Sequence, residues 1–537
     1  MTQSQGFGPV KTPGSGSGGG GAQPVSPFAR PRPFRVNLVA NGAGAVVTSV
    51  IQFLLVRLYL RKMGVEAYGL IGVMATLWTL VQLADVGISA AVNRELARRT
   101  ALGTDPRDVR DMVRTLEVGY AAVGVLLGLV VLLAAPFAET WLRHDRLSGE
   151  MVRHSVQATG LLIAAQWPFS FYQGVLLGLQ RHGLFNSIRT GMAAATAIGA
   201  YVVLTHVSTT PLALFLWQGV MAVGQVGLLA AFTWRCLPRD SHRPLVRPSS
   251  VSGLWHVAAG MFGVTATALI LSQIDRVVAS RLLSLETFGS YVLGATLANA
   301  LLYTFNAPVY ASVFPRLASL AALGDVPALR RGYQRDWALM VAATIPAAAA
   351  VSAFAEPLLL AWAGDVAAAH IASPIAVLLI GGTALNGLGS ITLALQLARN
   401  WTGIAVATNA GLCLVAFPAV WLLADRFGAI GVAAVWPGIN LCYVVVGLLV
   451  THCRLGPATD RRWLLRDVAM PALAAAAVVW MWRRWLPVPD GFLQAIVAVG
   501  SAWLLAVAAV VLLSPSMFDS ARRVIANLKS ATRESFG

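Results

Sequence analysis

Four charged side chains lie inside long apolar stretches and are the clearest candidates for chemistry: Arg57, Asp85, Asp275 and Arg276. Burying such a charge in a membrane costs roughly 2.5 to 3.5 kcal/mol even on a lenient scale, so each charge needs a reason. An arginine keeps its charge and presents a planar fork that matches phosphate oxygens, whereas a carboxylate in this setting carries a coupling proton or pairs with a base. The residue types therefore indicate an anion site with acids nearby. Mutual ion pairing, or snorkelling of the arginines to the membrane surface, explains them equally well.

Uncharged polar side chains in the same stretches extend the set of substrate-binding candidates to Gln52, Gln273 and Asn306. Hydrogen bonding between neighbouring membrane helices is the alternative role for such residues. Asp275 and Arg276 are adjacent in sequence, so on a helix their side chains are rotated by about 100 degrees from each other. We therefore expect this acid and this base to face different neighbours.

Signatures of enzymatic chemistry are absent from the sequence. The 4 cysteines have no CxxC spacing, which predicts neither a disulfide framework nor a metal site. No phosphate-binding loop of the G-x-x-x-x-G-K-[ST] type occurs either. We predict no catalytic residue, no metal and no cofactor, and energy for any transport would come from an ion gradient, the substrate gradient or a partner.

The composition identifies a membrane protein. Hydrophobic residues make up 57% of the chain and charged residues 12%, whereas soluble domains contain about 25% charged residues. The mean hydropathy is +0.68. A net charge of +17 would indicate a nucleic-acid partner in a soluble protein, but here the basic residues gather in short loops between apolar segments. We therefore expect membrane lipid, and no nucleic acid, around the chain.

The apolar segments predict an all-α polytopic membrane protein of about 14 transmembrane helices, at about 20 residues for each span. They are expected to form two parallel six-helix lobes plus an additional C-terminal pair. The predicted units are a disordered cytoplasmic tail (1–33), an N-lobe (34–234), a cytoplasmic linker (235–252), a C-lobe (253–452), the helix pair (453–514) and a cytoplasmic tail (515–537).

The arginine distribution predicts the orientation of the chain, because basic residues accumulate in cytoplasmic loops. Most of them fall on the side of the linker and the two tails, so both termini are expected to be cytoplasmic. The internal segments 94–114 and 316–335 carry mixed charge with apolar residues at helical spacing. These two segments predict short helices lying on the inner membrane surface.

Two similar turns recur about 220 residues apart and suggest an internal duplication. The first contains Glu66 followed by Tyr68-Gly69, and the second contains Glu286 followed by Phe288-Gly289. Each turn lies between two apolar segments, and Arg57 and Arg276 precede the two turns at similar distances. Internal duplication is common in secondary transporters, so the two arginines are expected at corresponding places in the two lobes.

The sequence resembles the polysaccharide-biosynthesis flippases of the multidrug/oligosaccharidyl-lipid/polysaccharide exporter superfamily. The likeness covers most of residues 37 to 451, and its motifs are Leu60 running into Tyr68-Gly69, Asp85-x-Gly87, Gln273-x-Asp275-Arg276, Phe288-Gly289-x-Tyr291 and Phe427 to Ala434. The resemblance implies a V-shaped molecule that alternates between inward- and outward-open states in the bacterial inner membrane. It further implies that a polyprenyl-diphosphate-linked oligosaccharide is the substrate, with a polysaccharide polymerase and a chain-length regulator as additional candidate partners.

The chain differs from this pattern by two predicted helices beyond the basic twelve. The identity of the glycolipid substrate therefore stays open. A peptidoglycan-precursor lipid flippase and a multidrug exporter of the same superfamily are alternatives, and so is a scaffold for a polysaccharide assembly complex. A membrane glycosyltransferase or polymerase is the alternative of a different class, but the predicted external loops are too short to present its chemistry. Under the leading hypothesis, Arg57 and Arg276 bind the lipid diphosphate. Asp85 and Asp275 carry the coupling ion or form ion pairs with basic residues.

Overall fold

Helices make up the regular structure of the chain. The computed structural model describes residues 34–85, 87–238, 240–251, 263, 265–455, 461–489, 491–520 and 522. Within these residues the named elements are helices and no strand is present, and 10 helices are long and apolar enough to cross a membrane. The polytopic, all-helical class predicted from the sequence is confirmed. The tail 1–33, residues 252–262 at the junction of the linker and the C-lobe, and most of the tail 515–537 lie outside the described part.

The N-terminal half, which precedes the linker, contains these elements: α1 (Phe34–Val81), η1 (Gln82–Asp85), α2 (Ile88–Ala101), α3 (Pro106–Trp141), α4 (Gly149–Gln166), α5 (Pro168–Gly178), α6 (His182–Val202), η2 (Val203–Val207) and α7 (Pro211–Cys236). The linker contains η3 (Pro248–Val251).

The C-terminal half contains α9 (Ile274–Leu282), α10 (Leu285–Leu301), η4 (Leu302–Asn306), α11 (Ala307–Ala322), α12 (Val326–Ala353), α13 (Ala355–Ala363), α14 (Val366–Ala398) and α15 (Thr402–Leu455). The last elements are α16 (Arg461–Trp463), η5 (Leu464–Ala469), α17 (Met470–Trp485) and α18 (Phe492–Leu513).

Two glycines divide the longest helices into pairs of antiparallel segments. Gly64 has φ 85° and ψ 174° inside α1, and Gly428 has φ 57° and ψ −138° inside α15. These backbone angles are open to glycine and strained for residues with a Cβ atom. The chain therefore reverses at Gly64, in the turn that carries the first copy of the repeated motif.

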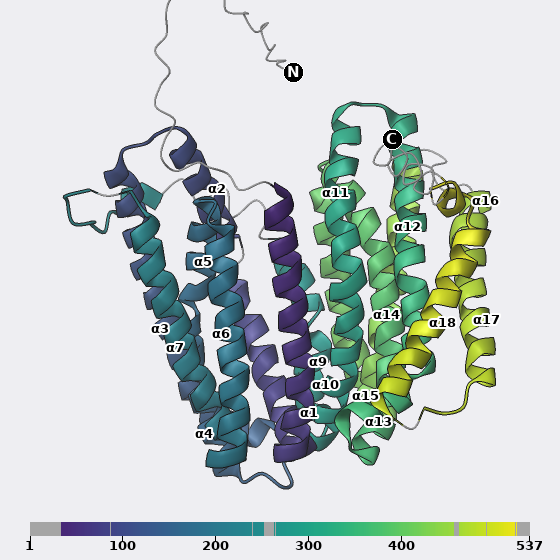
Figure 1. Cartoon of the computed structure of the whole chain (residues 1–537), viewed down its shortest axis with the longest axis horizontal. Coiled ribbons are helices and arrows are strands. Elements are labelled where there is room, and N and C mark those ends of the chain that lie inside the picture. Colours follow the sequence, from purple (N-terminus) through teal and green to yellow (C-terminus); the bar gives the residue numbers. More distant parts are fainter. Residues whose placement is uncertain are drawn as a thin grey trace, which may run out of the picture.

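The two halves form two groups of helices that stand side by side (Figure 1). We call the end of the molecule that carries residues 240–251 the linker end, and the opposite end, which carries the Gly64 turn, the far end. α17 and α18 pack against α12 at the outer edge of the C-terminal half. Large apolar side chains face outward along many helices; Leu133 of α3, for example, is 69% exposed. Such a surface is suited to lipid rather than to water.

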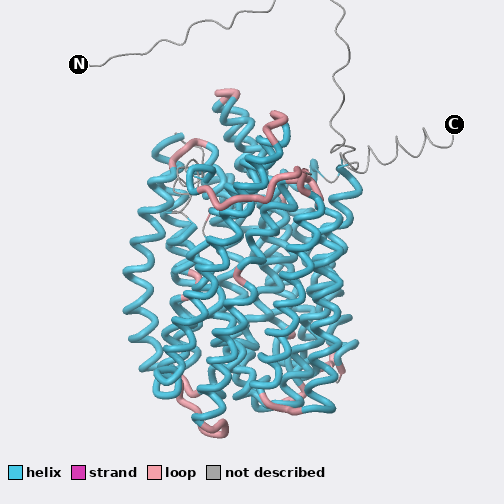
Figure 2. The backbone as a smooth tube through the Cα atoms, turned by 90° about the vertical axis from the view of Figure 1, so that its left-hand side faces the viewer, coloured by secondary structure: helices cyan, strands magenta, loops and turns pink. Residues whose placement is uncertain are grey.

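The predicted surface helices at 94–114 and 316–335 are wrong. α2 and α3 are separated by only four residues, and α11 and α12 by only three. Each segment therefore consists of the end of one helix and the start of the next, joined by a tight turn, and such helix pairs project at the linker end (Figure 2). Charges within a helix explain the mixed composition of the first segment, because Glu95 pairs with Arg98 at 2.7 Å and Arg99 at 2.8 Å.

Candidate functional site

α9 carries an acid and a base that were predicted to face different neighbours, but both lie beside the Tyr291 hydroxyl, and only Arg276 also lies near Tyr68 of α1. Asp275 accepts a hydrogen bond from the hydroxyl of Tyr291 on α10, while its second oxygen, Oδ1, is buried and has no partner among the described residues. Arg276 is half-buried and lies near enough to the hydroxyls of Tyr68 and Tyr291 to interact electrostatically. Among the described residues its guanidinium has neither a hydrogen bond nor an ion pair. Arg276 is therefore a cation beside α1 that has no ion-pair partner among the described residues.

Arg57 lies on a face of α1 that is directed toward the C-terminal half. The face is identified by Phe53 and Arg61, which precede and follow Arg57 by one helical turn. The Phe53 ring stacks on Trp362 of α13 with centroids 4.1 Å apart, and the Trp362 Nε1–H donates to the Phe53 carbonyl at 2.8 Å. Arg61 lies beside Gly364. Arg57 is half-buried and has no partner within the part of the chain that the structure describes.

The two predicted arginines thus lie on facing halves, both without an acidic partner. Neither arginine forms an ion pair with Asp85, Asp275 or another described acid. A multivalent anion is the kind of ligand that such a pair of charges accommodates. Mutual ion pairing of the four charged candidates, one of the two alternatives raised by the sequence, is not found among these residues.

Asp85 belongs to a different environment, inside the N-terminal half. It is buried and accepts a hydrogen bond from the Tyr120 hydroxyl of α3. The Ser89 and Ser170 hydroxyls lie beside the same carboxylate. Gly87, with φ 85°, follows it and starts α2. The Asp85-x-Gly87 motif therefore marks a break in the second membrane segment with a buried, hydrogen-bonded acid, and it is separate from the two arginines.

The amide candidates have mixed environments. Gln273 is buried just before α9, and its side-chain oxygen has no hydrogen-bond partner. Asn306 is buried at the end of η4, donates to the Thr383 carbonyl at 2.8 Å and packs on Gly387 of α14. It therefore fits the helix-linking alternative. The side chain of Gln52 lies outside the described residues, so this candidate stays a prediction.

The two copies of the repeated turn contact each other, which the sequence alone did not reveal. A Cβ atom at Gly69 would collide with the carbonyl oxygen of Leu285, and one at Gly289 would collide with the carbonyl oxygen of Val65. The two contacts are reciprocal, because Val65 and Leu285 occupy the same position in the two turns. Glycine at both places lets α1 and α10 approach backbone to backbone. This symmetric crossing joins the two halves.

A loop between α3 and α4 closes the far end over this crossing. Buried Glu66 accepts hydrogen bonds from the backbone N–H groups of Asp145 and Arg146, at 2.7 and 2.8 Å. The Leu285 N–H donates to the Arg143 carbonyl at 2.7 Å. The loop thereby connects the turn of one half to the turn of the other. Glu66, the acid of the Gly-x-Glu-x-Tyr-Gly motif, was visible in the sequence as part of the repeated turn. Its partners in the α3–α4 loop could not be identified from the sequence.

Side chains reinforce the closure. The Trp141 Nε1–H donates to Ser280 of α9 at 3.2 Å, and Arg281 donates to the carbonyls of Thr140 and Trp141 at 3.2 and 3.1 Å. Arg146 also pairs with Glu286 of α10 at 3.4 Å, and further hydrogen bonds between the halves join Phe53 with Trp362, and Tyr68 with Thr296. Within the described residues, α1 makes the main helix contacts across the halves, with α9, α10 and α13. The halves are therefore joined mainly toward the far end.

Comparisons with known proteins agree with this architecture. A family model described as polysaccharide biosynthesis protein matches residues 35–321, and no curated protein matches the chain. Among solved structures, the chain resembles the lipid II flippase MurJ in an inward closed conformation, with a TM-score of 0.66 and 11% identity over 88% of this chain and 98% of that one. It also resembles an inward-facing multidrug resistance MATE family transporter of the MOP superfamily, with a TM-score of 0.64 and 11% identity over 79% and 98%.

A third similar structure is the eukaryotic MATE transporter AtDTX14, with a TM-score of 0.55 and 12% identity over 81% of this chain and 97% of that one. At such identities the likeness establishes the fold, which is that of MOP-superfamily membrane transporters. The family-model match extends over more than half of the chain. The chain therefore belongs to the polysaccharide biosynthesis protein family.

Proposed function

We propose that this protein flips a polyprenyl-diphosphate-linked oligosaccharide across the bacterial inner membrane by alternating access, for the assembly of a surface polysaccharide. The observation that carries the proposal is the pair Arg57 and Arg276. Arg57 lies on the face of α1 that is directed toward the C-terminal half, and Arg276 lies beside α1. Both arginines are half-buried and have no protein partner among the described residues. A diphosphate supplies the negative charge that would compensate both arginines. Membership of the polysaccharide biosynthesis protein family supports a glycolipid as the cargo.

The closed far end supports an inward-facing state for this conformation. In the proposed orientation the linker end and both termini are cytoplasmic, as the basic residues of the linker favour. The substrate would enter between the halves from the cytoplasmic side. The halves would then rock so that the contacts around Gly69 and Gly289 separate and the head group is released on the outside. A polymerase and a chain-length regulator are proposed partners downstream of this release.

Reconstitution provides the direct test. Purified full-length protein in proteoliposomes should translocate a polyprenyl-diphosphate-linked oligosaccharide faster than either a lipid-linked peptidoglycan precursor or a cationic drug. Accessibility of the glycan to an impermeant glycosidase or lectin measures the movement, and protein-free vesicles measure leakage. Faster movement of the peptidoglycan precursor would assign the protein to that alternative substrate. Movement of the drug alone would identify an exporter.

Cysteine labelling tests the proposed orientation. In a background where the native cysteines are replaced by serine, Leu245→Cys should be protected from an impermeant maleimide in intact cells, whereas Glu150→Cys should react. Both positions are exposed on the described surface, at the linker end and near the far end respectively. Permeabilised cells, in which both cysteines should react, provide the control. The reverse pattern in intact cells would contradict cytoplasmic placement of the linker.

A further inference from the structure

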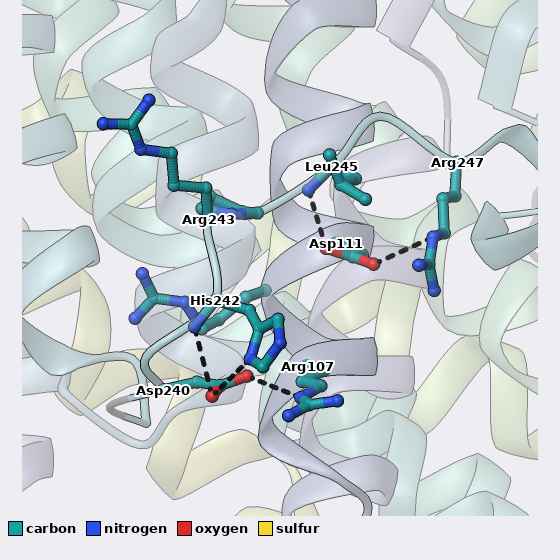
Figure 3. Close-up of a pocket in the computed structure, with 9 residues that line it drawn as sticks. Arg107, Asp111, Asp240, His242, Arg243, Leu245 and Arg247 are labelled. Atoms are coloured by element: carbon teal, nitrogen blue, oxygen red, sulfur yellow. Dashed lines mark hydrogen bonds and ion pairs between the residues drawn. The ribbon is translucent and has the colours of Figure 1, made fainter.

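The linker is bound to α3 through a buried carboxylate. Asp111 accepts the Leu245 N–H at 2.8 Å through Oδ1 and pairs with the Arg247 Nε at 3.2 Å through Oδ2 (Figure 3). The Arg247 N–H also donates to the Thr115 hydroxyl at 2.8 Å. Because Asp111 is buried away from water, leaving its charge without a partner would be strongly destabilising. The contacts with Leu245 and Arg247 compensate this charge. They hold residues 245–247 against one face of α3.

A second carboxylate organises the preceding part of the linker. Asp240 pairs with the Arg107 Nε of α3 at 3.2 Å and accepts the His242 N–H at 3.3 Å (Figure 3). Burial raises the pKa of the Asp240 carboxyl, but the hydrogen bonds from His242 and the charge of Arg107 lower it by more, so the pKa lies below its ordinary value. Asp240 is therefore ionised at neutral pH and compensates Arg107.

A cavity of about 90 Å³ lies between these two ion pairs, at the junction of α3 and the linker. Four arginines and two aspartates line it. Arg107 and Arg247 have acidic partners, whereas Arg110 and Arg243 have none among the described residues. The lining therefore carries a formal charge of 4 − 2 = +2, without counting His242.

The two arginines that lack acidic partners differ in accessibility. The Arg110 guanidinium lies over the Trp234 ring, 5.6 Å from its centroid, and donates from Nη1 to the Pro238 carbonyl at 3.1 Å. Its Nε is buried and has no hydrogen-bond partner. Arg243 is exposed, and in Figure 3 its side chain extends away from both ion pairs. One arginine is thus held at the cavity by Trp234 and Pro238, and the other is exposed at its edge.

We propose that this cavity is a binding site for a phosphate group. A phosphate carries a charge of about −1.5 to −2 at pH 7, which matches the uncompensated charge of the lining. The cavity of about 90 Å³ has room for a phosphate group. Guanidinium donors bind phosphate oxygens with strong, directed hydrogen bonds. The phosphate belongs either to an anionic lipid head group or to a small soluble molecule.

Occupancy of the site would tie the linker more firmly to α3. The linker is the covalent connection between the two halves, so its attachment to the N-terminal half limits how far the C-terminal half can move. The site is distinct from the pair Arg57 and Arg276, and its test does not depend on the transported substrate. It represents a regulatory anion site at the linker end.

The first arm of the test uses inorganic phosphate. Full-length protein in detergent should show a higher thermal unfolding midpoint in phosphate than in chloride of equal ionic strength. Arg110→Gln and Arg243→Gln should each weaken phosphate binding by about tenfold or more, as expected for loss of a charged hydrogen bond. Arg331→Gln, which removes an exposed arginine at the start of α12, should leave binding unchanged. Because Arg243 is exposed, its variant should fold even if the Arg110 variant does not.

The second arm distinguishes the source of the phosphate. Midpoints are compared in micelles that contain phosphatidic acid, phosphatidylglycerol or phosphatidylcholine. Stabilisation by phosphatidic acid alone, lost in Arg243→Gln, identifies a lipid head group. Stabilisation by inorganic phosphate, lost in the same variant, identifies a soluble ligand. If neither probe stabilises the wild type more than Arg243→Gln, or if Arg331→Gln loses the effect equally, the proposed site is wrong.

Discussion

Replacing Arg276 with Gln should abolish export of the surface polysaccharide, while replacing it with Lys should restore export only in part. Arg276 has no described protein partner and lies beside Tyr68 and Tyr291 at the junction of the halves. A hydrogen bond to a charged group contributes about 1.5 to 3 kcal/mol, so loss of one arginine contact should slow transport by about 10- to 100-fold. Lys keeps the charge but cannot present two parallel donors. The same order, Arg above Lys above Gln, is expected at Arg57.

The measurement is polysaccharide export in cells that lack the native protein, at matched membrane levels of each variant. Arg484→Gln on α17 provides a matched control, because it removes an exposed arginine from the outer edge of the molecule. Its export should equal that of the wild type. Wild-type export by both the Arg57→Gln and Arg276→Gln variants would eliminate the proposed diphosphate site and leave snorkelling as the explanation for Arg57.

Replacing Gly69 with Ala should prevent closure of the far end and strongly reduce transport. The added Cβ atom would collide with the Leu285 carbonyl oxygen, which belongs to backbone and cannot rotate away. Overpacking of this kind costs about 1 to 3 kcal/mol. This cost applies only while the halves are closed at the far end, so it should shift the population toward the opened state by about 5- to 150-fold. Gly289→Ala, which collides with the Val65 carbonyl, should have the same effect.

Accessibility at the far end tests this shift. Ser280 is buried and accepts the Trp141 N–H across the closed junction, so Ser280→Cys should react slowly with an external, impermeant maleimide. Adding Gly69→Ala should accelerate the reaction. Gly119→Ala is the matched control, because a Cβ atom there meets no neighbour within 4 Å. Unchanged reactivity together with normal transport in the Gly69 variant would contradict a role for the glycine crossing in closure.

The sequence by itself determined the class of protein, which is an all-helical polytopic membrane protein. Hydropathy and helical periodicity are local properties, so the apolar segments predict membrane helices without knowledge of their neighbours. The 100-degree rotation between consecutive residues agrees with the lack of an ion pair between Asp275 and Arg276 among the described residues, although both lie beside Tyr291. The repeated turns were also visible, because a duplicated segment retains similar residues at similar spacing. The exact number of membrane helices and the substrate remain predictions.

Only the tertiary structure decided which residues meet. The contact of Gly69 with Leu285 and of Gly289 with Val65 joins segments far apart in the chain, and no local pattern specifies such a crossing. The partner of Asp85 proved to be Tyr120, since a buried carboxylate is satisfied by whichever donor the packing brings near it. The predicted surface helices became extensions of longer helices, because a similar amphipathic pattern suits both arrangements. Local chemistry selected the candidates, and long-range packing selected their partners.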